Sequence, residues 1–169
     1  GDKIYTEQYE TLEQTCLELL RRAGKTFATA ESCTGGYVSK RITDLPGSSA
    51  VFRGGAAAYT ELAKQELLGV SAELIARVGA VSPKVAQAMA AGIRGRLRAD
   101  YGIGVTGLAG PDGDGSGKPV GLVYVALTDG TDSWVRELHL TGERERIRYI
   151  AAHHAFDMLR RALTKLPVE

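Results

Sequence analysis

Apolar positions along the chain alternate between two spacings, one typical of helices and one typical of strands. Residues 8–22 carry Leu12, Cys16 and Leu19 at helical spacing, and Gly24 follows where a helix would end. The same spacing, with capping residues and glycine or proline stops, predicts helices over residues 8–22, 37–45, 60–68, a segment that starts at Ser71, 84–98 and 143–166. Short apolar runs between them predict strands over residues 27–31, 50–59, 101–106, 120–128 and 133–140.

Local signals refine these boundaries. Gly54-Gly55 is expected to break the second strand, and Thr141 is expected to cap the last helix. Asp129-Gly130 predicts a hairpin between the last two strands. Helices that alternate with strands in this way predict the α/β class: a single layered domain over residues 1–169, with a mixed β-sheet of about four to five strands packed with helices.

Composition and charge exclude several classes of protein. With 44% hydrophobic and 24% charged residues, the chain is not expected to be disordered, and no apolar run is long enough for a membrane helix. The net charge of +1 makes nucleic acid an unexpected partner. Two cysteines outside any C-x-x-C pattern favour a reducing, cytoplasmic setting. Gly1 in place of Met is typical of a tag remnant or of a piece of a longer chain, and an N-terminal partner domain stays compatible with the sequence.

Familiar cofactor and metal signatures fail on their context. Gly102-Ile-Gly104-Val-Thr-Gly107 has the spacing of a dinucleotide-binding turn, but no helix is expected after it. Residues 112–117 match the first half of a calcium loop, but Val123 stands where the bidentate glutamate is required. His153 and His154 are adjacent on a helix and point to different faces, so they cannot hold one metal together. We therefore expect neither a metal nor an organic cofactor. The high glycine count, 21 of 169, indicates close approach of backbones somewhere in the fold.

The turn over residues 31–36 has the features of a reactive site. A strand ends there and a helix begins, so several backbone N–H groups are free to hold an anion. Ser32 or Cys33 would sit where those N–H groups could meet a developing oxyanion. The alternative is a simple capping turn, in which Ser32 or Thr34 only satisfies backbone donors.

A serine nucleophile needs a base, and the histidines are poorly placed to supply one. Tyr59 and Lys64 straddle the next strand-to-helix junction. Near the helix N-terminus, the dipole and desolvation would both disfavour the protonated form of Lys64. The alternative is an exposed lysine with a structural role.

Six blocks in one order make the resemblance to a known family specific. They are Ala30-Glu-Ser-Cys-Thr-Gly-Gly36, Leu45-Pro-Gly-Ser-Ser-Ala50, Tyr59 with Lys64, Gly79-Ala-Val-Ser82, Val105-Thr-Gly-Leu-Ala-Gly-Pro-Asp-Gly113 and Lys118-Pro-Val-Gly121. Together they resemble the CinA C-terminal domain family, whose characterised activity is nicotinamide mononucleotide deamidase. The resemblance implies hydrolysis of that carboxamide to the acid mononucleotide and ammonia, in pyridine-nucleotide recycling and without a cofactor.

The resemblance also assigns roles to residues. It makes Ser32 the nucleophile, Lys64 the base and Tyr59 a partner in proton transfer. Together with the turn and with arginine's match to phosphate, it predicts substrate binding by Cys33, Thr34, Gly35, Gly36, Ser48, Ser49, Thr106, Gly107, Arg144 and Arg146. The alternative for Arg144, Arg146 and Arg148 is a solvated face at the start of the last helix.

Two departures from the family pattern affect this interpretation. Glu61 stands where asparagine is common, and Leu122 where threonine is frequent. A carboxylate at position 61 that faced inward would raise the pKa of Lys64 or repel a substrate phosphate. Two other hypotheses stay open: a non-catalytic, nucleotide-binding or regulatory module linked to competence and DNA damage, and an enzyme with Cys33 as its nucleophile. A homo-oligomer is expected from the prevalence of such assemblies and from the resemblance.

Overall fold

The fold is a five-stranded mixed sheet between two layers of helices. A computed structural model describes residues 10–169, and the sheet order is β2-β1-β3-β4-β5. The strands are β1 (Phe27–Glu31), β2 (Phe52–Ala57), β3 (Tyr101–Gly107), β4 (Leu122–Thr128) and β5 (Ser133–His139). The strands β2, β1 and β3 are parallel, whereas β4 and β5 are antiparallel to their neighbours. The predicted α/β class and mixed sheet are confirmed.

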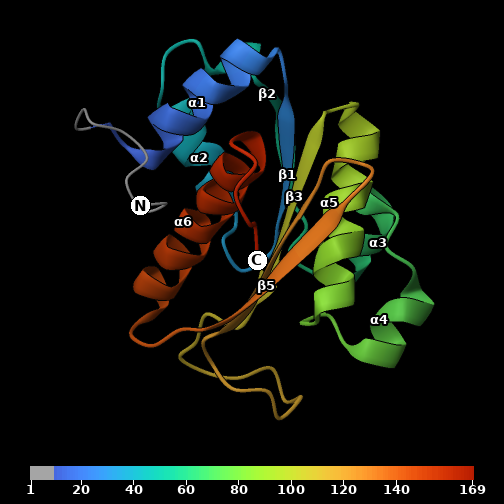
Figure 1. Ribbon diagram of the computed structural model, residues 1–169. Helices are drawn as coiled ribbons and strands as arrows, with labels where there is room; N and C mark the ends of the chain where they lie inside the picture. Colours follow the sequence, from blue (N-terminus) through green and yellow to red (C-terminus); the bar gives the residue numbers. More distant parts are fainter. Residues whose placement is uncertain (1–9) are drawn as a thin grey trace.

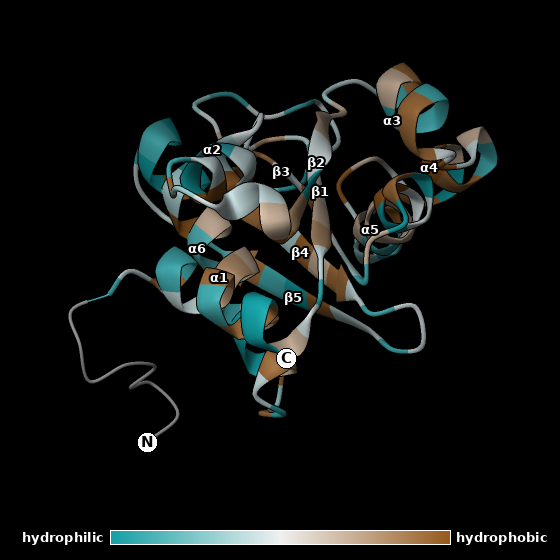
Figure 2. Cartoon of the chain, turned by 90° about the horizontal axis from the view of Figure 1, so that it is seen from above, coloured by the Kyte–Doolittle hydropathy of each residue, from teal (hydrophilic) through white to brown (hydrophobic). Residues whose placement is uncertain are grey.

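Two sets of three helices cover the two faces of the sheet (Figures 1 and 2). One face carries α1 (Leu12–Ala23), α2 (Tyr37–Thr43) and α6 (Arg144–Leu163). The other carries α3 (Glu61–Leu68), α4 (Ala72–Val78) and α5 (Pro83–Leu97), and a one-turn helix, η1 (Ser48–Ala50), precedes β2. None of the helices within residues 10–169 is long and apolar enough to cross a membrane.

Capping residues set the start of several helices as predicted. The side chains of Thr60, Ser71 and Ser82 accept hydrogen bonds from the backbone three residues on, and Pro83 occupies the first position of α5. These bonds satisfy donors that have no partner inside the helix. Local sequence therefore places the helices that flank the candidate site.

Alternation along the strands decides which helical layer each side chain meets. In β3, Ile103 and Val105 belong to the core under α1, α2 and α6, whereas Gly102 and Gly104 lie against α5. A Cβ atom at Gly102 would lie 2.2 Å from the carbonyl oxygen of Ala90. Glycine in the strand thus lets α5 pack directly on the sheet, and this is the role of the G-x-G spacing in this chain.

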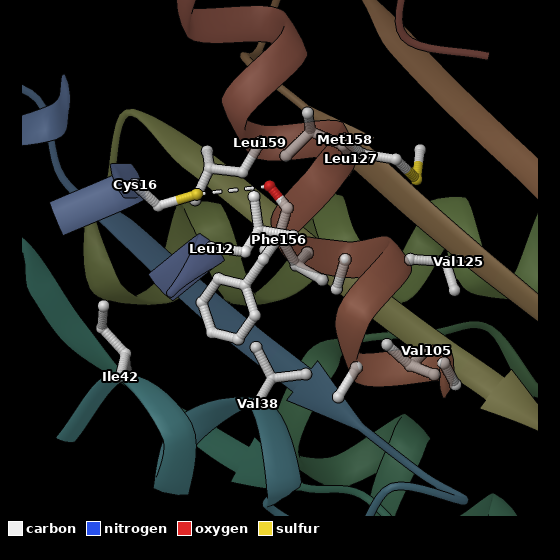
Figure 3. Packing of buried hydrophobic residues seen from close by; sticks show 14 of the residues in the cluster. Leu12, Cys16, Val38, Ile42, Val105, Val125, Leu127, Phe156, Met158 and Leu159 are labelled. Atoms are coloured by element: carbon white, nitrogen blue, oxygen red, sulfur yellow. Dashed lines mark hydrogen bonds between the residues drawn. The ribbon is translucent and has the colours of Figure 1, made fainter. Parts of the chain in front are cut away.

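The larger core lies between α1, α6 and the sheet. Figure 3 shows Phe156 of α6 surrounded by apolar side chains from α1, α2 and the central strands. The buried thiol of Cys16 donates a hydrogen bond of 3.2 Å to the carbonyl oxygen of Phe156 (Figure 3). This cysteine is therefore a packing residue of the α1–α6 contact.

Three predicted boundaries are wrong in detail. The first helix begins at Leu12, because Thr11 and Gln14 form a capping box there; residues 8 and 9 of the predicted helix lie outside the described residues. Gly54-Gly55 does not interrupt β2, whose pairing with β1 is irregular at Arg53 instead. The last helix has Glu143, not Thr141, at its N-cap, and it ends at Leu163.

Candidate active site

A cavity lies at the edge of the sheet where the three parallel strands end. Ser32 follows β1, Ala58 follows β2 and Gly107 ends β3, and parallel strands bring these ends to one edge. The segment between β3 and β4 forms a long loop beyond this edge (Figure 1). The cavity has a volume of about 360 Å³, and its walls come from the turn after β1, the start of α3, the residues before α5, this loop and Arg144.

Strand alternation aims Ser32 at α3. Ala28 and Ala30 face the layer of α3, α4 and α5, and Ser32 continues that side of the strand just beyond its end. Glu31 points to the opposite side, toward α2. The reactive hydroxyl and its neighbouring carboxylate are therefore separated by the sheet.

Lys64 and Ser32 form a buried pair. The Nζ atom of Lys64 donates hydrogen bonds to the Oγ atom of Ser32 (3.0 Å) and to the carbonyl oxygen of Ala58 (2.9 Å). Lys64 is 2% exposed and Ser32 is 8% exposed. Burial lowers the pKa of Lys64, while Cys33 and Glu61 act weakly in the opposite direction. A larger fraction of Lys64 is thus in the neutral form than for an ordinary lysine, and the neutral amine can accept the serine proton.

Backbone hydrogen bonds hold the two partners in register. The N–H group of Ser32 donates to the carbonyl oxygen of Val105, and that of Ala58 donates to the carbonyl oxygen of Glu31, both at 2.9 Å. Because Ala58 in turn accepts from Lys64, the nucleophile and the base are anchored to the same pair of strand ends. The geometry of the pair therefore depends on the sheet itself.

Glu31 is a site residue that sequence reasoning missed. Its carboxylate, 1% exposed, accepts hydrogen bonds from the backbone of Val38 (2.8 Å) and Ser39 (3.1 Å), and from the Ser39 hydroxyl (2.9 Å). The start of α2 therefore binds the protein's own carboxylate, not a ligand anion as expected. Strand alternation after Ala30 was the available signal, since it turns Glu31 away from Ser32.

Some donors of the turn stay available to a ligand. Within residues 10–169, no acceptor meets the backbone N–H groups of Cys33 and Thr34. The N–H group directly after a nucleophile is a frequent donor to the oxyanion of acyl transfer. Of the two residues, Cys33 lines the cavity, so its N–H group can supply such a donor beside Ser32.

Cys33 lines the cavity but has the properties of a packing residue. Its side chain is 5% exposed, and burial, with a smaller effect of Glu31, raises the pKa of the thiol to about 12. A thiol with that pKa is protonated at neutral pH and is a weak nucleophile. The chemistry of the site therefore favours Ser32 over Cys33.

Tyr59 and Arg144 meet at the mouth of the cavity. The Nη2 atom of Arg144 donates to the Tyr59 hydroxyl (2.9 Å), and its Nη1 atom donates to the carbonyl oxygen of Gly110 (2.6 Å). Tyr59 is 58% exposed, and its hydroxyl bonds to Arg144 instead of Ser32 or Lys64. The structure thus brings Tyr59 into the cavity wall without a direct link to the Ser32–Lys64 pair.

Thr106 and Gly107 line the cavity, as expected. The Thr106 hydroxyl donates to the carbonyl oxygen of Ala80 (2.8 Å) and so ties β3 to the segment before α5. A Cβ atom at Gly107 would lie 2.7 Å from the Val123 side chain, so the end of β3 requires glycine.

Other predicted binding residues lie away from the cavity. Thr34 is buried and does not line the cavity. Gly35 and Gly36 do not line it either, and they have φ angles of 59° and 111°, which glycine adopts readily. Ser48 and Ser49 belong to η1, which precedes β2. They therefore lie at the start of β2, whereas the cavity lies where β2 ends. Arg146 donates to the carbonyl oxygen of Thr141 outside the cavity.

Arg148 stabilises the turn after β1 through hydrogen bonds to its backbone. It donates hydrogen bonds of 3.0 Å to the carbonyl oxygens of Cys33 and Thr34. Of the arginines considered from the sequence, Arg144 therefore is the one that lines the cavity. Within residues 10–169, no group of three or more His, Cys, Asp or Glu side chains could hold a metal ion.

Comparisons with known proteins agree with this architecture. A family model described as CinA C-terminal domain matches residues 9–163. A CinA-like protein of Acidobacterium capsulatum is 52% identical over 96% of this chain and 39% of its own length. A putative competence-damage inducible protein of Acetivibrio thermocellus is 48% identical over 98% of this chain and 40% of its own length. The chain thus spans about two fifths of the length of these relatives.

Solved structures show the same fold. The competence/damage inducible protein CihA from Agrobacterium tumefaciens superposes with a TM-score of 0.86 at 36% identity, over 94% of this chain and 99% of that one. A CinA superfamily protein from Klebsiella pneumoniae gives a TM-score of 0.87 at 29% identity, over 92% of this chain and 99% of that chain.

Proposed function

The chain belongs to the family of CinA C-terminal domains, and on that premise we propose that it is an amidohydrolase that converts nicotinamide mononucleotide to nicotinic acid mononucleotide and ammonia. The observation that carries the proposal is the buried Ser32–Lys64 pair, with 3.0 Å between Oγ and Nζ, at the base of a cavity. A structural serine has no need of a lysine amine that burial has made easier to deprotonate.

The pair accounts for the proton transfers of amide hydrolysis. Neutral Lys64 takes the Ser32 proton while Oγ attacks the carboxamide carbon, and the N–H group of Cys33 stabilises the oxyanion. The Lys64 ammonium then gives its proton to the departing nitrogen, so ammonia leaves and an acyl ester with Ser32 remains. Lys64 next accepts a proton from water, whose oxygen attacks the ester carbon, and Lys64 gives this proton to the Ser32 Oγ atom as the ester C–O bond breaks. The acid mononucleotide and free Ser32 result.

Arg144 is the residue to which we assign the substrate phosphate. Its guanidinium lines the mouth of the cavity, and its planar pair of donors matches phosphate oxygens. Tyr59 positions that guanidinium through their 2.9 Å hydrogen bond. Tyr59 therefore acts on substrate binding in this proposal.

Ammonia release from nicotinamide mononucleotide by metal-free protein tests the proposal. We expect release by the wild type and loss of roughly a thousandfold or more in Ser32→Ala. Ser133→Ala is the matched control, because Ser133 is exposed at the start of β5, and it should keep full activity. Full activity of Ser32→Ala would overturn the mechanism. Binding of the mononucleotide by the wild type without ammonia release would favour a nucleotide-binding module.

A further inference from the structure

The wall of the cavity carries more negative than positive groups. Glu61, Asp112 and Asp114 line it, against the cations Lys64 and Arg144. Lys64 is buried and bonded to Ser32 and Ala58, and Arg144 bridges the mouth. A ligand in the cavity therefore meets three carboxylates in its wall, which is unusual for a site that takes a phosphorylated substrate.

Glu61 is the carboxylate best placed to act near the reaction. It is the first residue of α3, three positions before Lys64, and residues at this spacing share one side of a helix. Lys64 bonds to Ser32 and Ala58 and not to Glu61. The side chains of Glu61 and Asp112 have no hydrogen bond or ion pair with any other of residues 10–169. The carboxylate of Glu61 thus lines the cavity about one helical turn from Lys64, close enough to act on its pKa but without a hydrogen bond or ion pair to it.

We propose that Glu61 is a specificity residue that favours a substrate with a positively charged ring beside the scissile amide and disfavours the carboxylate product. The inference rests on the proposed function, because the ring of nicotinamide mononucleotide is a pyridinium cation whose amide must lie at Ser32. Attraction between Glu61 and that ring helps binding. Hydrolysis then creates a carboxylate on the same ring, and its repulsion by Glu61 offsets the attraction and promotes release.

A second role of Glu61 has to be separated from this one. A carboxylate in the first turn also stabilises a helix through the positive end of its dipole. Removal of the charge would therefore lower the stability of the protein, and this loss would not depend on the charge of a ligand. A comparison of ligands that differ only in ring charge therefore distinguishes the two roles.

Binding to Ser32→Ala protein, with and without Glu61→Gln, provides this comparison, since this background keeps the cavity but lacks the nucleophile. The three probes are nicotinamide mononucleotide, its 1,4-dihydro form, which has the same amide and phosphate on a neutral ring, and nicotinic acid mononucleotide. We expect Glu61→Gln to raise the Kd of the first about fivefold, as for one charge pair in a partly hydrated site. The dihydro form should keep its Kd, and the acid should change less than the amide.

Two further variants and one stability measurement control the experiment. Glu66→Gln removes an exposed carboxylate from the same helix outside the cavity, and it should change none of the three Kd values. Glu61→Asn, which removes the same charge with a shorter side chain, should give the same pattern of Kd changes, which keeps the proposal testable if Glu61→Gln unfolds. Thermal unfolding of each variant measures the contribution of the helix dipole separately.

The alternative outcomes separate a failure of the inference from a failure of the proposed function. Equal weakening of the oxidised and dihydro forms would mean that Glu61 only shapes the cavity, and unchanged Kd values would mean that it does not touch the ring; either result overturns the inference alone. Absence of ammonia release by the wild-type protein overturns the proposed function, and the inference fails with it.

Discussion

The amine of Lys64 lies 3.0 Å from the hydroxyl of Ser32, although the two residues are 32 positions apart in the sequence. One follows the strand β1 and the other lies on the helix α3 that follows β2. Their contact exists because β1 and β2 are parallel neighbours that end at the same edge of the sheet. The testable consequences of this contact concern the protonation of Lys64, the identity of the nucleophile and the support of the turn.

Replacement of Lys64 by Met should abolish activity without loss of stability at neutral pH. The amine is required as base, so we expect turnover to fall by roughly a thousandfold or more. The folded protein pays for burial of the charged form, as the lowered pKa of Lys64 shows, and Met removes that cost. Denaturant unfolding and ammonia release measure the two effects.

The pH dependence of stability tests the same assignment. The pKa of Lys64 is lower in the folded protein than its ordinary value of 10.5, so the unfolded chain binds more protons between the two values. Wild-type stability should therefore rise with pH through this interval, and Lys64→Met should lack that rise. Activity should fall as pH drops below the folded pKa, because the base becomes protonated. An identical pH dependence of stability in both proteins would contradict the assignment.

Cys33→Ala should keep activity within about threefold of the wild type, because the protonated thiol does not attack the amide. Its buried sulfur contributes to packing, so a loss of stability of about 1 kcal/mol is expected. Ammonia release and thermal unfolding check both statements. A loss of activity as large as that of Ser32→Ala would instead assign the nucleophile to Cys33.

Glu31→Gln should lower kcat more than it changes KM. The glutamine amide cannot accept all three hydrogen bonds that the carboxylate receives from Val38 and Ser39, so the turn that carries Ser32 shifts. A displacement of this kind lowers the rate by up to about a hundredfold, and the lost bonds lower stability by about 1–3 kcal/mol. Steady-state kinetics test the split, with Glu66→Gln as control. Unchanged kcat with reduced stability would limit Glu31 to the role of a helix cap.

Two glycines of α5 should respond in opposite directions to the same substitution. A Cβ atom at Gly92 would lie 2.1 Å from the carbonyl oxygen of Leu68, whereas nothing lies within 4 Å of one at Gly95. We expect Gly92→Ala to destabilise the protein by about 2 kcal/mol or more, through displacement of α3. Gly95→Ala should stabilise it by about 0.5–1 kcal/mol, the ordinary gain within a helix. Denaturant unfolding of the two variants measures both changes in the free energy of unfolding. Similar changes in the two variants would contradict close α3–α5 packing.

Much of the local structure was readable from the sequence. The caps at Thr60, Ser71 and Ser82, the strand Phe27–Glu31 and the hairpin after β4 depend on interactions between residues close in the chain. Among the boundaries that failed, the expected break at Gly54-Gly55 involves contacts with another element, since Gly55 lies against Thr29 and Ser39. The start of the first helix depends instead on the local capping box between Thr11 and Gln14.

The candidate site was readable in part, and the rest depends on the order of the strands. Their place at strand-to-helix junctions made Ser32 and Lys64 candidates, beside the alternatives of a capping serine and an exposed lysine, and the family resemblance assigned their roles. The sequence could not show that the end of β2 brings Tyr59 next to Arg144 of the last helix, while Ser48 and Ser49 are left at the other end of that strand. Periodicity determines which side of an element a residue faces, but only the sheet order determines which ends coincide. That order arises from packing between residues far apart in the chain, which no local pattern records.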